Sequence, residues 1–436
     1  MNTPLRLIGL TTIAAILAAC GGAAAPAPTA APAASTEKQP AQPAAASGAC
    51  TISFGAAVSF TGSTAAEGKY TKDGYDIAKD KINEKGGIKV GDKMCKLDIK
   101  YYDDASSPDQ TAQLVEKLIT EDKVNFILGP YGSSSSDTAA AIVEKYKIPM
   151  IEANGAAESI FARGFKFTFA VLSPAGNYLR GILDLVKVKD PSAKKVAVVA
   201  ETDKFALEVA AGAAKYAKEQ GFEVVYNDKY PAKATDISSN LTVIKGLNPD
   251  VILGAGHIQD AILTIKQGKE LGVNAKAWGF SVGPTAPEFR KSLGKDADYV
   301  LGAAQWTEEL KLKGDANDPF STPQDFAKAV RAKFPQGGYE TTIPYQVAES
   351  AAAVFAFQRA IEKAGSLDAQ KVRDAIAALD FDSFYGKVKF DERGINTFKP
   401  MAVQQNATDG GNYTVGPAES ASKPFEYPAP AWGSRK

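Results

Sequence analysis

Apolar and polar residues alternate along the chain in a way that predicts strands followed by helices. Short β-favouring apolar runs are each followed by a longer run with helical periodicity. In the first part of the chain the predicted strands are 51–58, 96–102, 125–128 and 149–151, and the predicted helices are 69–84, 109–120 and 138–147. This alternation predicts a parallel sheet covered by helices on both faces.

The same pattern is repeated after a strand-like run at 165–171. The second series predicts strands at 195–200, 223–230, 251–255 and 275–280, with helices at 206–220, 238–247 and 261–271. A crossing strand at 299–306, helices at 346–364 and 368–379, and edge strands at 384–390 and 398–404 follow. Two α/β lobes with doubly wound parallel sheets are therefore expected, with a ligand cleft at the carboxyl ends of their strands.

The start of the chain has a different pattern. The apolar run 7–17 follows a single arginine and is too short to span a bilayer, so it predicts a signal peptide over 1–19. The sequence Leu-Ala-Ala-Cys at 17–20 resembles a bacterial lipobox, which implies a lipid on Cys20 and a membrane-anchored, extracytoplasmic protein. The alternative is an ordinary secretory peptide with a chance cysteine. Residues 20–48 are rich in Ala and Pro, which predicts a tether.

Charge and cysteine usage narrow the function classes. Lys plus Arg (50) balances Asp plus Glu (50), without a basic tract, so nucleic acid is not expected as a partner. Cys50 and Cys95 each stand at the start of a predicted strand, and a disulfide would join them if those strands are neighbours. Two buried thiols are the alternative. With 1 His and no Cys/His cluster, neither a metal nor a cofactor is predicted.

The segment 129–137, Gly-Pro-Tyr-Gly-Ser-Ser-Ser-Ser-Asp, precedes a predicted helix. Glycines allow close backbone approach, serines supply hydroxyls, and a helix start presents free N–H groups, which together suit a carboxylate. The alternative is that one serine or Asp137 only caps the helix. Four serines exceed what a cap requires, so an anion site is favoured, with Ser133 and Ser134 as candidates.

Several of these segments resemble the solute-binding proteins of branched-chain amino-acid ABC transporters. They are Lys-Gly-Gly-Ile-Lys at 85–89, Tyr-Asp-Asp at 102–104, the glycine- and serine-rich segment, Ile-Pro-Met-Ile at 148–151, Ala-Thr-Asp-Ile-Ser at 234–238, Asn-Pro-Asp-Val-Ile-Leu at 248–253 and Lys-Glu-Leu-Gly at 269–272. The resemblance covers most of 50–395 in the family's order. It implies a type I periplasmic-binding fold with a three-strand hinge, whose lobes close over a small solute and deliver it to a membrane permease.

The expected domain boundaries follow from this resemblance. Lobe 1 comprises 49–171 plus about 306–365, lobe 2 comprises 172–305 plus about 366–418, and 419–436 is an irregular tail. The resemblance also implies ligand-contacting positions. These are Ser133, Asn154 and Ala156 in lobe 1, His257 and Ser281 in lobe 2, and Glu67 and Phe205 where the family has tyrosines.

Four aromatic residues, Phe60, Tyr131, Phe205 and Phe280, lie in or beside the predicted loops and either line an apolar pocket or belong to the core. His257 follows a strand directly and is interpreted as a ligand contact or as a structural histidine.

Two departures from the family bear on the ligand. Ala156 lacks the hydroxyl that helps bind a carboxylate, and Ser281 replaces the acid that holds an ammonium. A buried ammonium without a counter-charge costs several kcal/mol. The ligand is therefore expected to be a small amino acid or a related carboxylate or amide that does not require an α-amino group. Alternatively, Glu67 supplies the missing charge.

Catalysis and ligand sensing are the two rival functions. Catalysis is disfavoured because the chain has a lone His, no Gly-x-Ser-x-Gly elbow and no clustered metal ligands. A ligand-sensing module for a separate membrane receptor is the alternative to transport, and it would use the same cleft.

Overall fold

The computed structural model describes residues 50–435. The expected signal peptide, the lipid site at Cys20 and the tether therefore lie outside the described residues. Within 50–435, no helix combines the length and apolar character needed to cross a bilayer.

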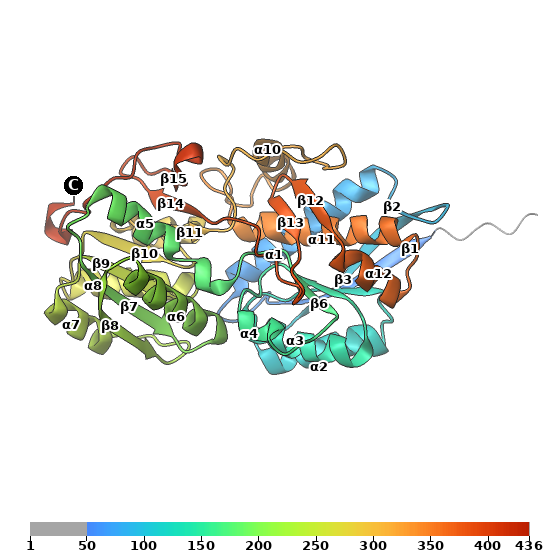
Figure 1. Ribbon diagram of the computed structural model, residues 1–436, viewed down its shortest axis with the longest axis horizontal. Coiled ribbons are helices and arrows are strands. Elements are labelled where there is room, and N and C mark those ends of the chain that lie inside the picture. The colour runs from blue at the N-terminus through green and yellow to red at the C-terminus, as the bar shows by residue number, and fades with distance from the viewer. Residues whose placement is uncertain (1–49, 436) are drawn as a thin grey trace, which may run out of the picture. The chain divides into compact units, whose positions relative to one another are not determined.

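The strands of lobe 1 are β1 (Thr51–Val58), β2 (Ile88–Val90), β3 (Lys93–Asp103), β4 (Phe126–Leu128), β5 (Met150–Glu152) and β6 (Thr168–Ala170). They form one sheet in the order β2–β3–β1–β4–β5–β6. All neighbours are parallel except β2 and β3. The helices α1 (Ala65–Glu84) and α11 (Tyr345–Ala364) pack together, and α2 (Pro108–Thr120) packs with α3 (Ser133–Tyr146) below the sheet in Figure 1.

Lobe 2 has a second sheet. Its strands are β7 (Lys195–Glu201), β8 (Glu223–Tyr230), β9 (Val251–Ala255), β10 (Ala277–Phe280), β11 (Leu301–Ala304), β14 (Ala402–Asn406) and β15 (Asn412–Gly416), in the order β15–β14–β11–β10–β9–β7–β8. Helix α5 (Arg180–Lys189) packs with α6 (Lys204–Glu219), and α7 (Ser238–Leu247) with α8 (Ile258–Glu270). Both sheets and their covering helices confirm the expected α/β fold.

The remaining elements show where the chain changes lobes. They are α4 (Glu158–Phe161), α9 (Pro287–Leu293), α10 (Pro323–Lys333), α12 (Ala369–Ala377), β12 (Asp380–Ser383) and β13 (Gly386–Lys389). Helix α12 packs on α11, and Arg373 of α12 donates to the carbonyl of Lys166 at 2.8 Å. Because β14 is the next strand of the second sheet, the return to lobe 2 falls at about 396–401, later than the boundary near 366 that the sequence suggested.

The three crossings between the lobes are hydrogen-bonded to one another. Gln305, after β11, donates to the Ser173 carbonyl and accepts from its N–H, both at 3.0 Å. Ser173 follows β6, and its hydroxyl donates to the carbonyl of Lys399, just before β14. The Lys399 ammonium in turn donates to the Gln305 carbonyl. These contacts define a hinge of three adjacent segments.

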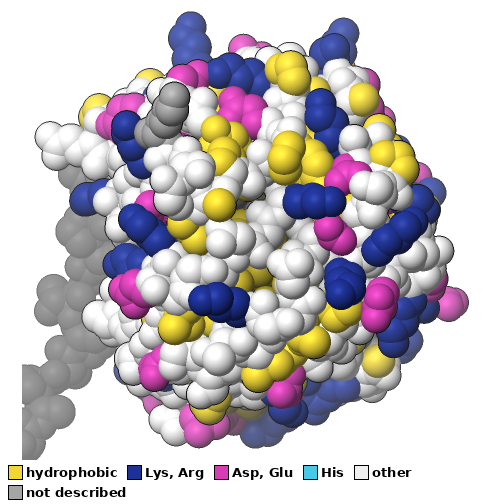
Figure 2. Space-filling view, turned by 90° about the vertical axis from the view of Figure 1, so that its left-hand side faces the viewer, with side chains coloured by type: hydrophobic (Ala, Val, Ile, Leu, Met, Phe, Trp, Pro, Cys, Tyr) yellow, Lys and Arg dark blue, Asp and Glu magenta, His cyan; other side chains and the backbone are white. Residues whose placement is uncertain are grey.

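The C-terminal segment is packed against lobe 2, although it has little regular structure. Trp432 contacts Trp278 with ring centroids 5.7 Å apart, and the Tyr427 hydroxyl donates to Asp190 at 2.8 Å. The end of the molecule shown in Figure 2 carries basic and acidic side chains interspersed with one another.

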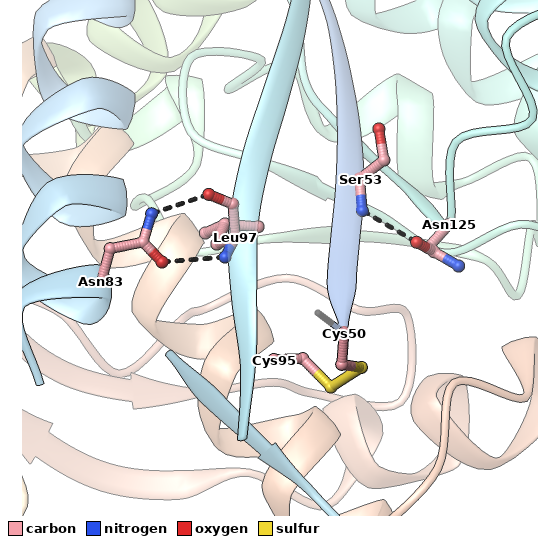
Figure 3. Close-up of a disulfide and its surroundings, with 6 residues drawn as sticks. All are labelled: Cys50, Ser53, Asn83, Cys95, Leu97 and Asn125. Carbon is pink, nitrogen blue, oxygen red and sulfur yellow. Dashed lines mark hydrogen bonds between the residues drawn. A yellow bond between two sulfur atoms is a disulfide. The ribbon is translucent and has the colours of Figure 1, made fainter. Parts of the chain in front are cut away.

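A disulfide joins Cys50 to Cys95, which confirms the pairing expected if their strands are neighbours. Strand β1 pairs in parallel with β3, in the register Thr51 to Lys96. Figure 3 shows the bond between the two strands, with the Asn125 side chain accepting from the Ser53 N–H nearby.

Candidate functional site

The residues that bring the two lobes together lie at the carboxyl ends of the strands. Tyr131 follows β4 in lobe 1, and His257 follows β9 in lobe 2. The Tyr131 hydroxyl lies 3.0 Å from Nδ1 of His257. A second cross-lobe contact joins Glu67 of α1 to the start of α8, where its Oε1 accepts from the N–H of Ile258 at 3.1 Å. The cleft is therefore closed.

Helix α3 begins five residues before the predicted start because Gly132, with φ +85°, turns the chain directly into it. No side chain caps this helix. Asp137 instead pairs with Arg163 at 2.8 Å and with Lys204 of lobe 2 at 3.3 Å. The first amide that is bonded within the helix is that of Ser136, which donates to the Gly132 carbonyl at 3.0 Å. The preceding N–H groups form the positive end of α3.

The four serines have separate roles. Ser133 is fully buried, and its Oγ accepts from the N–H of Ala157 at 3.0 Å, which fixes the loop after β5. Ser135 accepts from the Thr111 hydroxyl, and Ser136 donates to the Gly132 carbonyl. Ser134 lines a pocket at the mouth of the cleft. The hydroxyls thus mainly hold the backbone in place, whereas the helix start presents its N–H groups.

His257 is held as a cation. Burial acts to lower its pKa. The negative charges of Asp203, Glu67 and Glu201 outweigh burial and raise the pKa to about 10, and Oδ2 of Asp203 lies 2.9 Å from Nε2. Both ring nitrogens then donate, one to Asp203 and the other to Tyr131. The ring also packs on Phe205, with centroids 5.7 Å apart.

Glu67 is buried at the contact between the lobes and does not line the deep cavity. Its side chain is 1% exposed, and its carboxylate accepts from the first amide of α8. Burial raises its pKa, while His257 and the Ile258 N–H lower it. Its role here is to join the lobes.

Three cavities follow the cleft from its mouth inward. Two pockets of about 370 and 290 Å³ lie at the mouth and share Ser63, Thr64, Glu201, Lys233 and His257. A deep cavity of only about 10 Å³ lies behind them, and Tyr131, Gly132 and His257 line both it and the 290 Å³ pocket. The Tyr131–His257 pair is therefore the wall between mouth and interior. A ligand reaches the deep cavity only when the lobes separate and these rings move.

The deep cavity has a lining that the sequence only partly predicted. Asn154, Tyr131, Phe205 and His257 were expected to meet, and they do. Tyr178, Val282, Tyr345, Gln346 and Glu349 were missed. Three of the missed residues belong to α11, whose alanine-rich sequence predicts an amphipathic helix that returns to lobe 1. The sequence feature that could have identified them is the pair of polar residues Gln346 and Glu349 in a helix with few solvent-facing positions.

Other expected contacts lie elsewhere. Ser281 is fully buried, and its hydroxyl accepts from the Gly256 N–H at 3.1 Å and donates to the Gly256 carbonyl at 3.0 Å. Phe280 packs against Phe289 in the core of lobe 2. Ala156 is buried in the loop after β5. Phe60 is 36% exposed and packs against Tyr101. None of these four side chains lines the cavities.

Glu201, Asp203 and His257 place possible ligand atoms within 4.8 Å of one another. Both nitrogens of His257 are already hydrogen-bonded, and the ring is charged. A protonated imidazole offers no lone pair to a metal, so the arrangement fits a histidine held by ion pairs.

Comparison with known proteins places this geometry in a family. The family model described as "Periplasmic binding protein" matches residues 51–412. Leu/Ile/Val-binding protein homolog 7 of Brucella abortus is 27% identical over 400 residues, covering 86% of this chain and 94% of that protein. Homolog 8 of the same organism is 27% identical over 393 residues, covering 85% and 91%.

Solved structures share the fold. A branched-chain amino acid transporter substrate-binding protein of Streptococcus pneumoniae, in complex with isoleucine, has a TM-score of 0.71 at 22% identity, covering 84% of this chain and 100% of that one. A solute-binding protein of R. palustris, in complex with benzoate, has a TM-score of 0.70 at 19% identity, covering 87% and 97%. With two sheets, a three-segment hinge and a cleft closed over its own lining, this chain belongs to the periplasmic binding protein family.

Proposed function

We propose that this protein captures a small amino acid or a related carboxylate or amide in the cleft between its lobes and delivers it to a membrane permease. The observation that carries the proposal is the uncapped start of α3 at a cavity that both lobes line. Free N–H groups at a helix start suit a carboxylate. Tyr131 and His257 close off the cavity, and at about 10 Å³ it has room for about one water, so the lobes must close less tightly around a ligand than they do here.

The ligands of related structures support this range. The isoleucine complex and the benzoate complex both carry a carboxylate, on an aliphatic and on an aromatic body. Such ligands bind the closed state better than the open one and so shift the population towards closure. A permease then responds to the closed lobes.

The direct test is to purify residues 49–436, denature the protein and identify any released small molecule by mass spectrometry. Thermal unfolding with a panel of amino acids, aromatic acids and amides would follow. We expect a carboxylate- or amide-bearing compound to be released, or to raise the melting temperature. If no compound is released and none on the panel stabilises the protein, the proposal is wrong.

The lipid on Cys20 belongs to the same proposal. Attachment near the permease would raise the local concentration of the binding protein. Cys20→Ala should release the protein from membranes and reduce uptake, while the ligand affinity of the purified protein stays the same. Uptake that is unaffected by release would contradict this role.

A further inference from the structure

Glu349 is a buried acid at the deep cavity without a matching cation. Its side chain is 1% exposed, and it accepts one long hydrogen bond, 3.4 Å from the Tyr385 hydroxyl. Among the described residues it forms no ion pair within 4 Å. Lys399 is near enough for its charge to act on Glu349, but its ammonium donates to the Gln305 carbonyl and lies 4.2 Å from the centre of the Tyr385 ring. Burial raises the pKa of Glu349 well above its usual range, although Lys399 and Tyr385 act to lower it.

Two further acceptors line the same cavity without a partner. Oδ1 of Asn154 and Oε1 of Gln346 make no hydrogen bond, and these side chains are only 6% and 2% exposed. A buried acceptor left unpaired costs about 1–3 kcal/mol. The cavity therefore combines a carboxyl group and two amide oxygens, all on lobe 1, and the two amide oxygens have no hydrogen-bond partner although tyrosine hydroxyls also belong to the lining.

We propose that Glu349, together with Asn154 and Gln346, receives the protonated amino group of the ligand, while the start of α3 receives its carboxylate. An ammonium carries three N–H donors, one for each acceptor. Gly132, at the start of α3, lines the same cavity, so the two groups of an α-amino acid reach their partners together. Phe205 and Val282 of lobe 2 leave an apolar wall for a hydrocarbon side chain.

This inference rests on the proposed function and specifies its ligand as an α-amino acid with an apolar side chain. It also resolves the missing acid at position 281. The hydroxyl of Ser281 is occupied by Gly256, and Glu67, whose Oε1 accepts from α8, does not line the deep cavity, whereas Glu349 does. The counter-charge comes from α11 of lobe 1 instead.

Calorimetric titration with matched pairs tests the inference. L-leucine is compared with isocaproate, and L-phenylalanine with hydrocinnamate, because each pair differs only in the amino group. Wild-type protein should bind one amino acid about tenfold or more tightly than its deaminated partner. Glu349→Gln should bring that ratio close to one. Asp104→Asn serves as control, because Asp104 is an equally buried acid of lobe 1 that neither lines the cavity nor faces Glu349, and it should leave the ratio unchanged.

A second readout needs no variant. Because burial raises the pKa of Glu349 and an ion pair with the ammonium would lower it again, titrations in two buffers of different ionisation enthalpy should show more proton release for the amino acid than for its deaminated partner. The groups that face Glu349 are Lys399, Glu152 and the tyrosines at 75, 131, 178, 345 and 385. Loss of the release in Glu349→Gln assigns the proton to this residue. Gln346→Leu, which should weaken only the amino acid, covers the case in which Glu349→Gln does not fold.

The outcomes separate the two proposals. If a carboxylate or amide binds with no preference for an amino group, or if Glu349→Gln retains the wild-type ratio, the inference is overturned and the proposed function stands. A co-purified ligand without a basic nitrogen would also overturn the inference and leave the proposed function standing. If no probe binds and none co-purifies, both are overturned.

Discussion

The hydroxyl of Tyr131 in lobe 1 and Nδ1 of His257 in lobe 2 lie 3.0 Å apart and form the wall between the mouth of the cleft and its interior. Each residue follows a central strand of its own sheet. The contact exists only when the lobes are together, so it stabilises the closed state relative to the open one.

Tyr131→Phe removes this hydrogen bond and keeps the ring. A hydrogen bond to a charged group contributes about 1.5–3 kcal/mol, so ligand affinity should fall about tenfold or more, as measured by calorimetry. Tyr146→Phe is a matched control at the far end of α3, where the hydroxyl donates to Glu116. It should leave the affinity unchanged. Equal affinities for wild type and Tyr131→Phe would show that this pair does not hold the lobes together.

Glu67 offers a second test of closure. Glu67→Gln keeps an acceptor for the Ile258 N–H, whereas Glu67→Leu removes it. The Leu variant should therefore have a larger radius of gyration with ligand than the Gln variant, as measured by small-angle scattering. The preference for an amino group should persist in Glu67→Gln. If that preference were lost, Glu67 rather than Glu349 would supply the counter-charge.

The histidine predicts a pH dependence of stability. Unfolded histidine loses its proton near pH 6.5, whereas folded His257 holds it to about pH 10. Its stabilising contribution is thus complete below about pH 6.5, declines by about 1.4 kcal/mol per unit above that, and is lost above about pH 10. The gap in unfolding free energy between wild type and His257→Gln should narrow accordingly, as measured by urea denaturation at about pH 6, 8 and 10.

Wild type must be compared with His257→Gln, because the titration of Lys399 changes stability with pH in the opposite direction to that of His257. Burial lowers the pKa of Lys399 to about 7, so the contribution of Lys399 to the unfolding free energy increases as pH rises. Both proteins contain Lys399, so this contribution cancels in the difference between them. The charge of His257 does not change between about pH 5.5 and 8, so His257 contributes no pH dependence to ligand affinity over that range, and a rise in amino-acid affinity with pH there reports the proton that Glu349 releases. A gap in unfolding free energy that stays constant with pH would contradict the charged state.

The disulfide predicts a large effect on stability. Cys50 and Cys95 are separated by 45 residues, and a cross-link over such a loop stabilises by roughly 3–4 kcal/mol through the unfolded chain. Removing both sulfurs, as Cys50→Ala with Cys95→Ala, should lower the unfolding free energy of the purified protein by about that amount. Ligand affinity should hold, because the bond lies at the opposite ends of β1 and β3 from the cleft. Equal stability of variant and wild type would contradict this.

Much of the fold was predictable because strand and helix periodicities are local. The bounds of β1, β8, α7 and β9 agree with the sequence prediction. The start of α3 was missed because a run of serines has poor helix propensity, whereas the positive φ of Gly132 decides where the helix begins. The lobe boundary near 366 was misplaced because α12 is fixed by its packing on α11, which sequence periodicity does not show.

The site was predicted in part for the same reason. Asn154 and His257 follow strands directly, so the βα pattern locates them. Glu349 comes from a helix almost two hundred residues further along the chain than Asn154, and only the tertiary fold brings it to the cavity. Ser281 shows the reverse case, because its position in the sequence suggested a ligand contact and its hydroxyl is occupied by the backbone.

The Cys50–Cys95 bond has a mechanical consequence. Cys50 is where the chain enters lobe 1, and the bond fastens that point to β3, which is paired with β1 on one side and β2 on the other. A force that pulls on the chain ahead of Cys50 is therefore shared covalently with a second strand. Without the disulfide, the same force would act on the first hydrogen bonds of β1 alone and would break them one after another from the end of the strand. The disulfide makes lobe 1 resistant to peeling at the point where a tether would load it.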